Sequence, residues 1–269
     1  AADHHAQNAG AILQQLLDNE VRLSDVKAIA FSQGPGLGPC LRIGASVARS
    51  LATQLNVPLV GVNHCVAHIE VGRERCNCDD PVLLYASGGN TQVIARLDGK
   101  YRVLGETLDI GIGNMLDKFA REQGIPFPGG PKIETLAQEW LNENPQPSLE
   151  GLELPYAVQG MDLAFSGLLN AALNLVKKGT PLAAVCWSLQ EHAFAACVEV
   201  AERAMAHAGK QELLLGGGVA CNERLRNMCH IMTESRGGTS HVPVKSLCID
   251  NGSMIATLGR LQLLWGAPT

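Results

Sequence analysis

Apolar residues follow helical and strand spacing in turn along the first part of the chain. Residues 5–19 carry apolar side chains at helical spacing, whereas the short apolar runs at 26–31 and 58–62 predict strands. Between these strands lie a glycine-rich loop and a predicted helix at 41–55. A strand, a loop, a helix and a second strand make a βαβ unit, so we expect the two strands to be parallel.

From residue 81 onward the pattern changes to short strands joined by a glycine turn. Runs at 81–87 and 91–95 flank the tripeptide Gly88-Gly89-Asn90, and a third run follows at 101–107. Strands that follow one another through such tight turns pair with their neighbours. This order predicts an antiparallel meander.

Helices dominate the rest of the chain, with one more buried strand at 212–215 that opens into a glycine loop at 216–222. The predicted helices span residues 114–123, 132–142, 165–176, 183–207 and 250–264. The change of pattern predicts two lobes of mixed α/β structure. We expect residues 1–78, completed by the C-terminal helix 250–269, to form the first lobe, and residues 79–249 to form the second.

Composition and charge limit the ways in which the chain can bind its partners. Glycine accounts for 29 of the 269 residues, which exceeds the roughly 7% usual in proteins. These glycines cluster between apolar segments, where the backbone must turn sharply or approach a ligand closely. The formal net charge of −5 does not suit a protein that binds a polynucleotide alone by neutralising phosphates. Binding of nucleic acid therefore needs a local basic patch or basic partner subunits.

The nine cysteines are an odd number, which indicates free thiols in a reducing cytosol rather than a disulfide framework. Cys76 and Cys78 are close enough to share a metal, but no second cysteine pair lies nearby in the sequence, so an ordinary loop is the favoured interpretation. The apolar runs are all shorter than the about 20 residues of a membrane span. We therefore expect a cytoplasmic protein without a membrane partner.

His64 and His68 are the first candidates for chemistry. They lie four residues apart in the segment 63–72, which predicts a helix directly after a strand. Residues at this spacing share one helix face, so both imidazoles can reach a single metal ion. Such a pair alone is more often incidental, and the glutamate of the His-Glu-x-x-His protease motif is missing. The position after a strand end, where open α/β sheets bind ligands, favours a metal site.

A metal site needs a third ligand, and Asp250 is the candidate. It opens the last predicted helix, where a carboxylate is also a common N-cap, so capping and metal binding both remain open for this residue. Two neutral histidines with one carboxylate suit iron or zinc and leave positions for a substrate oxygen.

Two glycine loops are consistent with a nucleotide site. Residues 87–91 and 216–222 both follow predicted strands, and backbone N–H groups in such turns can bind phosphate. Neither loop matches the Walker or dinucleotide patterns, so each alone is weak evidence. Asp117 and Glu134 fall near glycines on separate helices, where they could accept hydrogen bonds from ribose or be solvated surface charges.

Five motifs occur in one order along the chain, at residues 32–36 (SQGPG), 61–70 (GVNHCVAHIE), 84–92 (LYASGGNTQ), 160–167 (GMDLAFSG) and 250–256 (DNGSMIA). Together they resemble one family, the tRNA threonylcarbamoyladenosine synthases, which include the catalytic subunit of the KEOPS complex and were formerly named O-sialoglycoprotein endopeptidases. The resemblance spans nearly the whole chain, and Asn90 in place of a histidine is typical of the archaeal and eukaryotic branch.

The resemblance implies a fold and a reaction. The family has the two-lobed actin-like, sugar kinase and Hsp70 (ASKHA) fold, whose first strands precede the helix with which this chain begins. We expect those strands to be absent here, in a fragment, a processed product or an incompletely described chain, which would expose a sheet edge. Family members transfer the threonylcarbamoyl group from threonylcarbamoyl-AMP to N6 of the adenosine 3′ of the anticodon, in tRNAs that read ANN codons, and release AMP.

For the site, the resemblance implies one iron or zinc ion bound by His64, His68, Tyr85 and Asp250, with the two histidines and the aspartate as catalytic residues. It also implies that the ATP-type or AMP-type nucleotide is bound by residues of the glycine loops and nearby helices: Tyr85, Ala86, Ser87, Gly88, Gly89, Asp117, Gly130, Glu134 and Asn222. The implied partners are tRNA and the KEOPS subunits, among them a small dimerisation subunit and a kinase subunit that is either separate or fused.

Three other functions compete with the transferase. A non-catalytic paralogue that acts as a dimerising scaffold would lack the paired histidines and Asp250, which this chain has. A metalloprotease would need the glutamate between the histidines. A small-molecule kinase of the same fold would bind Mg²⁺ through acidic residues rather than through two histidines. The sequence therefore favours the transferase.

Overall fold

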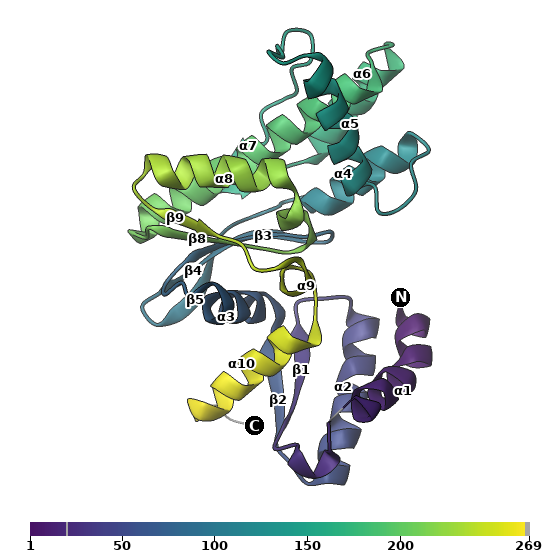
Figure 1. The fold of residues 1–269 in the computed structure, drawn as a ribbon, viewed down its shortest axis with the longest axis vertical. Coiled ribbons are helices and arrows are strands. Elements are labelled where there is room, and N and C mark those ends of the chain that lie inside the picture. Colours follow the sequence, from purple (N-terminus) through teal and green to yellow (C-terminus); the bar gives the residue numbers. More distant parts are fainter. Residues whose placement is uncertain (20, 267–269) are drawn as a thin grey trace. The chain divides into compact units, whose positions relative to one another are not determined.

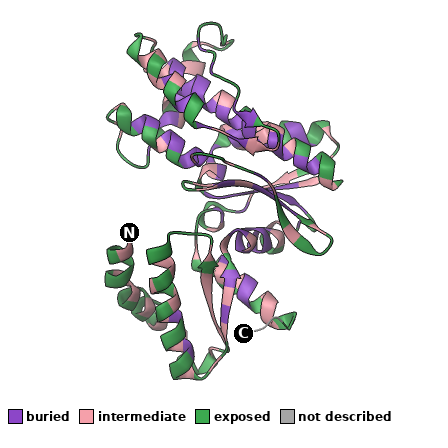
Figure 2. Cartoon of the chain, turned by 180° about the vertical axis from the view of Figure 1, so that it is seen from behind, coloured by how far each residue is buried: buried purple, intermediate pink, exposed green. Residues whose placement is uncertain are grey.

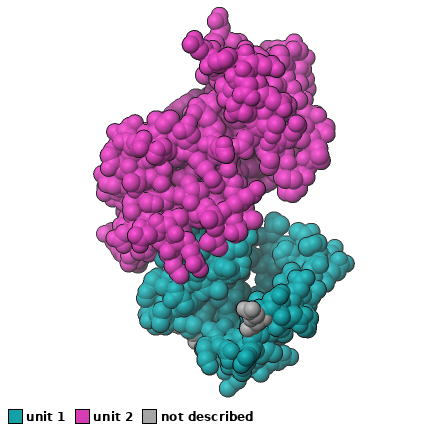
Figure 3. All heavy atoms as spheres, in the orientation of Figure 1, with its two compact units in different colours: residues 1–71, 250–269 teal, residues 72–249 magenta. Residues whose placement is uncertain are grey.

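The computed structural model describes residues 1–19 and 21–266, which form two compact units. The first unit contains Ala1–Val71 and the segment from Asp250 onward, and the second contains Gly72–Ile249 (Figure 3). The boundary falls inside helix α3 (His64–Cys76), whereas the sequence placed it near residue 79. Gly72 explains the difference, because a Cβ atom there would lie 2.4 Å from Cδ2 of Leu214 in the second unit. The last turns of α3 therefore pack in the second unit.

The first unit contains the predicted βαβ arrangement. Strand β1 (Ile29–Gly34) pairs in parallel with β2 (Leu59–Asn63), and helix α2 (Gly38–Leu55) connects them, so the parallel prediction is confirmed. Helices α2 and α10 (Gly252–Leu264) flank the two strands (Figure 1). Helix α1 (Ala2–Asp18) packs on α2 and has no fully buried residue, and a short 3₁₀ turn, η1 (Leu23–Asp25), precedes β1.

Helix α10 approaches β1 closely at Gly259. A Cβ atom at this position would lie 2.5 Å from Cβ of Ala30, a distance that real Cβ atoms do not reach. Because glycine has no side chain, the helix can rest directly on the strand. This contact fixes the helix that follows Asp250 in the sequence.

The second unit is built on one mixed five-stranded sheet in the order β5-β4-β3-β8-β9. Strands β3 (Val82–Ala86), β4 (Thr91–Leu97) and β5 (Lys100–Glu106) form the predicted antiparallel meander. Strand β8 (Glu212–Gly216) runs parallel to β3, and β9 (Thr239–His241) runs parallel to β8. Strand β9 was not predicted, because three residues without an apolar run give no strand pattern.

Helices cover the sheet of the second unit and bury most of its core. The longest, α7 (Leu182–Ala208), packs against four of the five strands (Figure 1). Figure 2 shows buried positions concentrated in α7 and in the sheet, and the largest buried side chains include Phe119, Phe165 and Phe194. The other elements of this unit are α4 (Ile112–Glu122), α5 (Gly130–Glu143), β6 (Val158–Gln159), β7 (Asp162–Leu163), α6 (Ser166–Lys177), η2 (Gly218–Cys221), α8 (Glu223–Ser235) and α9 (Lys245–Cys248). Among the described residues, no helix is long and apolar enough to cross a membrane.

The carboxylate of Asp109 holds the beginning of α6. Its Oδ1 accepts hydrogen bonds from the backbone N–H groups of Ile110 (2.6 Å) and Phe165 (2.9 Å), and its Oδ2 accepts from the backbone N–H and the hydroxyl of Ser166. Partial burial alone would raise the pKa of Asp109, but these hydrogen bonds outweigh it and hold the pKa below its usual value.

An Asp109→Asn substitution is expected to cost about 1–3 kcal/mol of stability, because an amide group turns a donor toward groups that are themselves donors. Since the pKa of the folded carboxyl is lowered, its stabilisation is present above the pKa of the unfolded chain and is lost as the pH falls through the folded value. The difference between wild type and variant, measured by urea unfolding, should therefore be constant near pH 7 and shrink below about pH 4. A difference that stays the same across this range would contradict the role assigned to the charge.

Candidate metal centre

The sequence places His64 at the point where a strand runs directly into a helix. Strand β2 ends at Asn63 and α3 begins at His64. The Oδ1 atom of Asn63 accepts a hydrogen bond from the backbone N–H of Val66 (3.1 Å), which satisfies a free donor of the first turn. His68 follows one turn later, so the predicted helix with both histidines on one face is confirmed.

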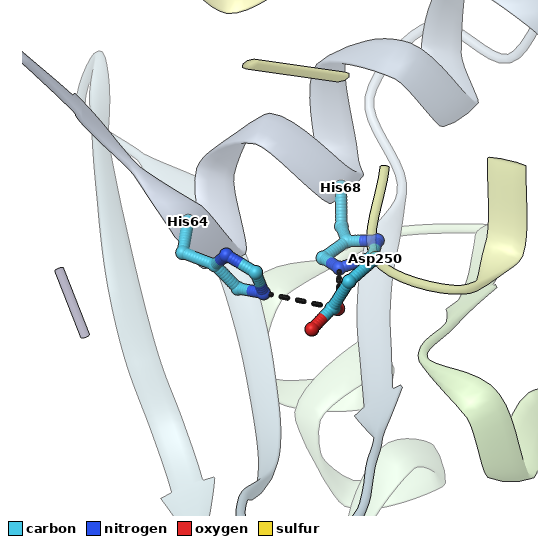
Figure 4. A group of neighbouring side chains, drawn as sticks. All are labelled: His64, His68 and Asp250. Atoms are coloured by element: carbon cyan, nitrogen blue, oxygen red, sulfur yellow. Dashed lines mark hydrogen bonds and ion pairs between the residues drawn. The ribbon is translucent and has the colours of Figure 1, made fainter. Parts of the chain in front are cut away.

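Asp250 completes a group of three possible metal ligands. Its Oδ1 atom lies 3.2 Å from Nε2 of His64 and 3.2 Å from Nε2 of His68 (Figure 4). The centroids of the two imidazole rings are 5.1 Å apart. One ligand atom from each of the three residues lies within 4.8 Å of the others, and all three residues belong to the first unit.

Asn251, rather than Asp250, caps helix α10. The helix begins at Gly252, and the Oδ1 atom of Asn251 accepts a hydrogen bond from the backbone N–H of Met254 (2.9 Å). The alternative reading of Asp250 as the N-cap is therefore wrong. Because its neighbour satisfies the helix end, the Asp250 carboxylate is available to the histidines.

Burial and charge favour the metal-binding forms of these side chains. The side chain of His68 is 1% exposed, and burial lowers its pKa even though the hydrogen bond to Asp250 acts in the opposite direction. Hydrogen bonds from both histidines hold the pKa of Asp250 well below its usual range, against the effect of partial burial. Near neutral pH the group therefore offers a neutral imidazole at His68 and a carboxylate at Asp250, the forms that bind metals.

The spacing of the ligand atoms fits a metal ion. Metal–nitrogen and metal–oxygen bonds of about 2.0–2.1 Å in a tetrahedral site separate neighbouring ligand atoms by about 3.3–3.4 Å. The observed separations of 3.2 Å between Asp250 Oδ1 and each Nε2 are close to this value. Two nitrogens and one oxygen suit iron or zinc. Cys65 is no competing ligand, because burial raises the pKa of its thiol to about 11, with a further contribution from the charge of Asp250.

An Asn251→Ala substitution is expected to weaken zinc binding by about 10-fold, the lower end of the range for residues that orient metal ligands. Without the side-chain acceptor, the start of α10 frays and Asp250 loses its fixed position. Competition with a chromophoric chelator measures the affinity. An Asn251→Ser variant, which retains a capping oxygen, should bind zinc nearly as tightly as the wild type. Equal weakening in both variants would rule out capping as the cause.

The two glycine loops lie side by side in the second unit. Strands β3 and β8 are parallel neighbours, with Tyr85 opposite Gly216, so the loops that follow them leave the same end of the sheet. At Gly217 the two loops are so close that an added Cβ atom would lie 2.4 Å from the carbonyl oxygen of Ala86. This end of the sheet is where parallel strands usually bind ligands.

The turn after β3 supports the beginning of α4. Ser87 donates its hydroxyl hydrogen to the carbonyl of Asn90 (2.8 Å). The backbone N–H groups of Gly113 and Asn114 donate to the carbonyls of Ser87 (3.0 Å) and Gly88 (2.9 Å). The predicted nucleotide residues Ala86 to Gly89 therefore form a turn held by the strand and by this helix.

Hydrogen bonds also hold the other predicted nucleotide residues. Asp117 accepts from the backbone N–H of Gly129 (2.8 Å), next to Gly130 at the start of α5, and Glu134 accepts from the backbone N–H of Glu223 (2.8 Å). Asn222 caps α8 and donates to Oε1 of Gln190 (2.8 Å), a partner that no sequence motif pointed to. Neither acid is a merely solvated charge, and nucleotide binding by this set remains a prediction.

A cavity of about 1180 Å³ opens between α5, α7 and α8. Glu134 lines it, together with Trp187, Gln190 and Cys221. Tyr85, the predicted fourth metal ligand, is a buried residue of β3 in the second unit, and its role as a ligand also remains a prediction.

Comparisons with known proteins give the family. The family model described as tRNA N6-adenosine threonylcarbamoyltransferase (TsaD) matches residues 1–257. The chain is 55% identical over 263 residues to the tRNA N6-adenosine threonylcarbamoyltransferase of Methanocella arvoryzae, covering 98% of this chain and 78% of that protein. It is 54% identical over 266 residues to a probable bifunctional tRNA threonylcarbamoyladenosine biosynthesis protein of Methanosarcina barkeri, covering 97% of this chain and 47% of that protein. The chain thus spans about half the length of such bifunctional relatives.

A solved structure is similar in fold. The crystal structure of HypF from T. kodakarensis matches 92% of this chain and 42% of that chain with a TM-score of 0.65 and 18% sequence identity. At this identity the similarity supports the mixed-sheet α/β fold alone. The family model, which covers nearly the whole sequence, and the archaeal relatives agree with the family to which the five motifs pointed. The chain belongs to the tRNA N6-adenosine threonylcarbamoyltransferase family.

Proposed function

We propose that the protein transfers the threonylcarbamoyl group from threonylcarbamoyl-AMP to N6 of the adenosine 3′ of the anticodon, in tRNAs that read ANN codons. One observation carries the proposal. In a member of this family, the possible metal-ligand atoms of His64, His68 and Asp250 lie within 4.8 Å of one another. In the reaction the adenosine amine forms a bond to the carbamoyl carbon, the bond from that carbon to the phosphate oxygen breaks, and AMP leaves.

His64, His68 and Asp250 would hold one iron or zinc ion, and the resemblance adds Tyr85 as a fourth ligand. When bound, the ion would supply Lewis-acid polarisation of the threonylcarbamoyl carbonyl. The protein's own contribution is to keep His68 neutral by burial and to keep Asp250 charged through its two hydrogen bonds. Fixing the two reactants in place can lower the barrier by several kcal/mol, up to about 7–11 kcal/mol in favourable cases.

The adenylate would be bound by the set Tyr85, Ala86, Ser87, Gly88, Gly89, Asp117, Gly130, Glu134 and Asn222. Two features support this assignment. The glycine loops that follow β3 and β8 are adjacent, so their backbone N–H groups can face one phosphate. Glu134 lines the large cavity beside Asn222, where a carboxylate can accept hydrogen bonds from ribose hydroxyls.

We infer that the two units are the lobes of an actin-like ASKHA fold and that the protein works in the cytoplasm with partners. The net charge of −5 favours help from basic subunits in binding tRNA. KEOPS subunits, including the small dimerisation subunit, are the proposed partners, and the bifunctional relatives suggest a kinase region fused to the same chain in some members. The nine cysteines form no disulfide in the described part of the chain, which is consistent with a reducing compartment.

The test is transfer by the full-length protein with its partners. Incubation with threonylcarbamoyl-AMP, labelled in the carbamoyl carbon, and a tRNA that reads an ANN codon should place the label on the adenosine 3′ of the anticodon. A tRNA with guanosine at that position should stay unlabelled. Phosphorylation of a small molecule, or cleavage of a peptide, without label in the tRNA would replace the proposal by a kinase or a protease.

A further inference from the structure

The loop that joins α4 to α5 presents a phenylalanine to solvent (Figure 1). Phe127 is 84% exposed, more than any other large hydrophobic residue in the described part of the chain, whereas Phe119, Phe165 and Phe194 are fully buried. A single exposed hydrophobic side chain is common on protein surfaces, so exposure alone assigns no function. The rigid loop below this ring and the cations beside it make it a candidate contact for a ligand.

Hydrogen bonds fix the loop at both ends although the ring of Phe127 is exposed. The backbone N–H of Ile125 donates to the carbonyl of Ala120 (2.9 Å) at one end. At the other end, the backbone N–H of Gly129 donates to Oδ1 of Asp117 (2.8 Å), and a Cβ atom at Gly129 would lie 2.3 Å from Cβ of Ala120. The residues on both sides of Phe127 are prolines, which restrict the backbone. A ring held in this way loses little conformational freedom when a flat partner binds it.

Three cations flank the loop. Lys118 and Arg121 are exposed and lie three residues apart on one face of α4, and Lys132 is exposed in the first turn of α5. Within the described residues, none of these three cations takes part in an ion pair. Of the two acids nearby on α4, Asp117 accepts a backbone hydrogen bond from the loop, and Glu122 is exposed. An exposed ring beside unpaired cations is typical of surfaces that bind single-stranded nucleic acid.

The exposed face of α4 connects this loop with the predicted adenylate site. The helix begins on the glycine turn after β3, where a Cβ atom at Gly88 would lie 3.4 Å from Oδ1 of Asn114. Asn114, Lys118 and Arg121 are all exposed and follow at the spacing of one helix face. At 1.5 Å per residue, this face extends about 10 Å from Asn114 to Arg121. An RNA strand whose adenosine reaches an adenylate bound at the turn therefore has its neighbouring nucleotides within reach of the loop.

We propose that Phe127 stacks on an unpaired base of the tRNA anticodon loop. The flanking cations Lys118, Arg121 and Lys132 contact the phosphates next to that base. This inference rests on the proposed transfer to tRNA and adds a surface with which the second unit holds the acceptor. A local group of cations also lets a chain with a net charge of −5 contact a polyanion. A protein partner fits less well, because a single ring among cations offers little of the apolar area that forms the core of a protein interface.

Binding of a fluorescent anticodon stem-loop RNA to the full-length protein with its partners, measured by anisotropy, tests this surface. Phe127→Ala is expected to weaken binding by about 5-fold or more, the effect of losing one stacked base, and Phe127→Trp should bind as tightly as the wild type. Joint replacement of Lys118 and Arg121 by alanine should weaken binding and reduce its dependence on salt concentration. Tyr156→Ala, at an aromatic residue of the same unit that is 70% exposed, is the control and should bind RNA normally.

Further measurements on Phe127→Ala separate stacking from an effect on folding or on the adenylate. The thermal unfolding midpoint and the affinity for AMP should both equal those of the wild type, because the exposed ring is not part of the core. In the transfer reaction, the variant should raise KM for tRNA and leave kcat nearly unchanged.

Equal RNA affinity of the wild type and Phe127→Ala would overturn the inference, even where transfer by the wild type supports the proposed function. Loss of a partner subunit from the purified Phe127→Ala complex would also overturn it, because the ring would then contact a protein. RNA binding that depends on Phe127 in a wild type without transfer activity would instead support this surface and contradict the proposed function.

Discussion

A His68→Ala variant is expected to lose its metal and, with it, threonylcarbamoyl transfer. His68 is the most buried of the three ligands and shares Oδ1 of Asp250 with His64. Residues that only orient ligands change metal affinity by about 10–100-fold, so removal of a ligand should cost at least about 100-fold. The metal content of the purified protein, measured by mass spectrometry, and zinc affinity by chelator competition report the effect.

Folding must be separated from metal loss in this variant. Loss of a buried imidazole also leaves a cavity, so the thermal unfolding midpoint should be recorded beside the metal content. His64→Ala, at a position that is 17% exposed, should lose metal to a similar degree with less effect on folding. His207→Ala, on the exposed side of α7, is the control and should keep metal and activity. Full metal content in His68→Ala would show that the ligands lie elsewhere.

A Gly217→Ala substitution is expected to destabilise the second unit by about 3 kcal/mol or more, a large part of the about 5–15 kcal/mol that stabilises a typical protein. The backbone at Gly217 has a φ of +91°, which side chains rarely adopt, and an added Cβ would lie 2.4 Å from the carbonyl oxygen of Ala86. To relieve this contact, the loop after β8 must move away from the turn after β3. Urea unfolding measures the loss, and nucleotide binding should fall with it.

The next residue provides a matched control. A Cβ atom at Gly218 would have no neighbour within 4 Å, and Gly218 is not among the glycines with positive φ. Gly218→Ala should therefore change stability by no more than about 0.5–1 kcal/mol. Equal destabilisation by both substitutions would show that the close approach to Ala86 is not the cause.

Local sequence patterns predicted much of this fold, because helix faces and tight turns depend on residues that are close together in the sequence. The spacing of His64 and His68, directly after a strand, was enough to place both side chains on one helix face, and short turns specified the meander of β3, β4 and β5. Helix caps were harder to predict. Asp250 and Asn251 are both good capping residues by type, and only the path of the chain determines which one faces the helix end.

Contacts between distant segments left no pattern in the sequence. Asp109 holds Ser166 at the start of α6, and Asn222 donates to Gln190, yet neither pair is marked by spacing or composition. The position of Asp250 beside the histidines is also a contact between distant segments, because Asp250 lies 182 positions after His68 in the sequence. Residue type made Asp250 a candidate third ligand but left capping open, and the family resemblance then implied that it binds the metal.

The most direct test of the metal centre is to titrate metal-free full-length protein, with its partners, with Fe²⁺ or Zn²⁺ and to measure bound metal and labelled tRNA in the same samples. We expect transfer to be absent from the metal-free protein and to rise in proportion to bound metal until about one ion is bound per chain. His68→Ala should stay inactive throughout the titration. Transfer at the full rate by the metal-free protein, or by His68→Ala, would contradict the assignment of His64, His68 and Asp250 as the metal centre.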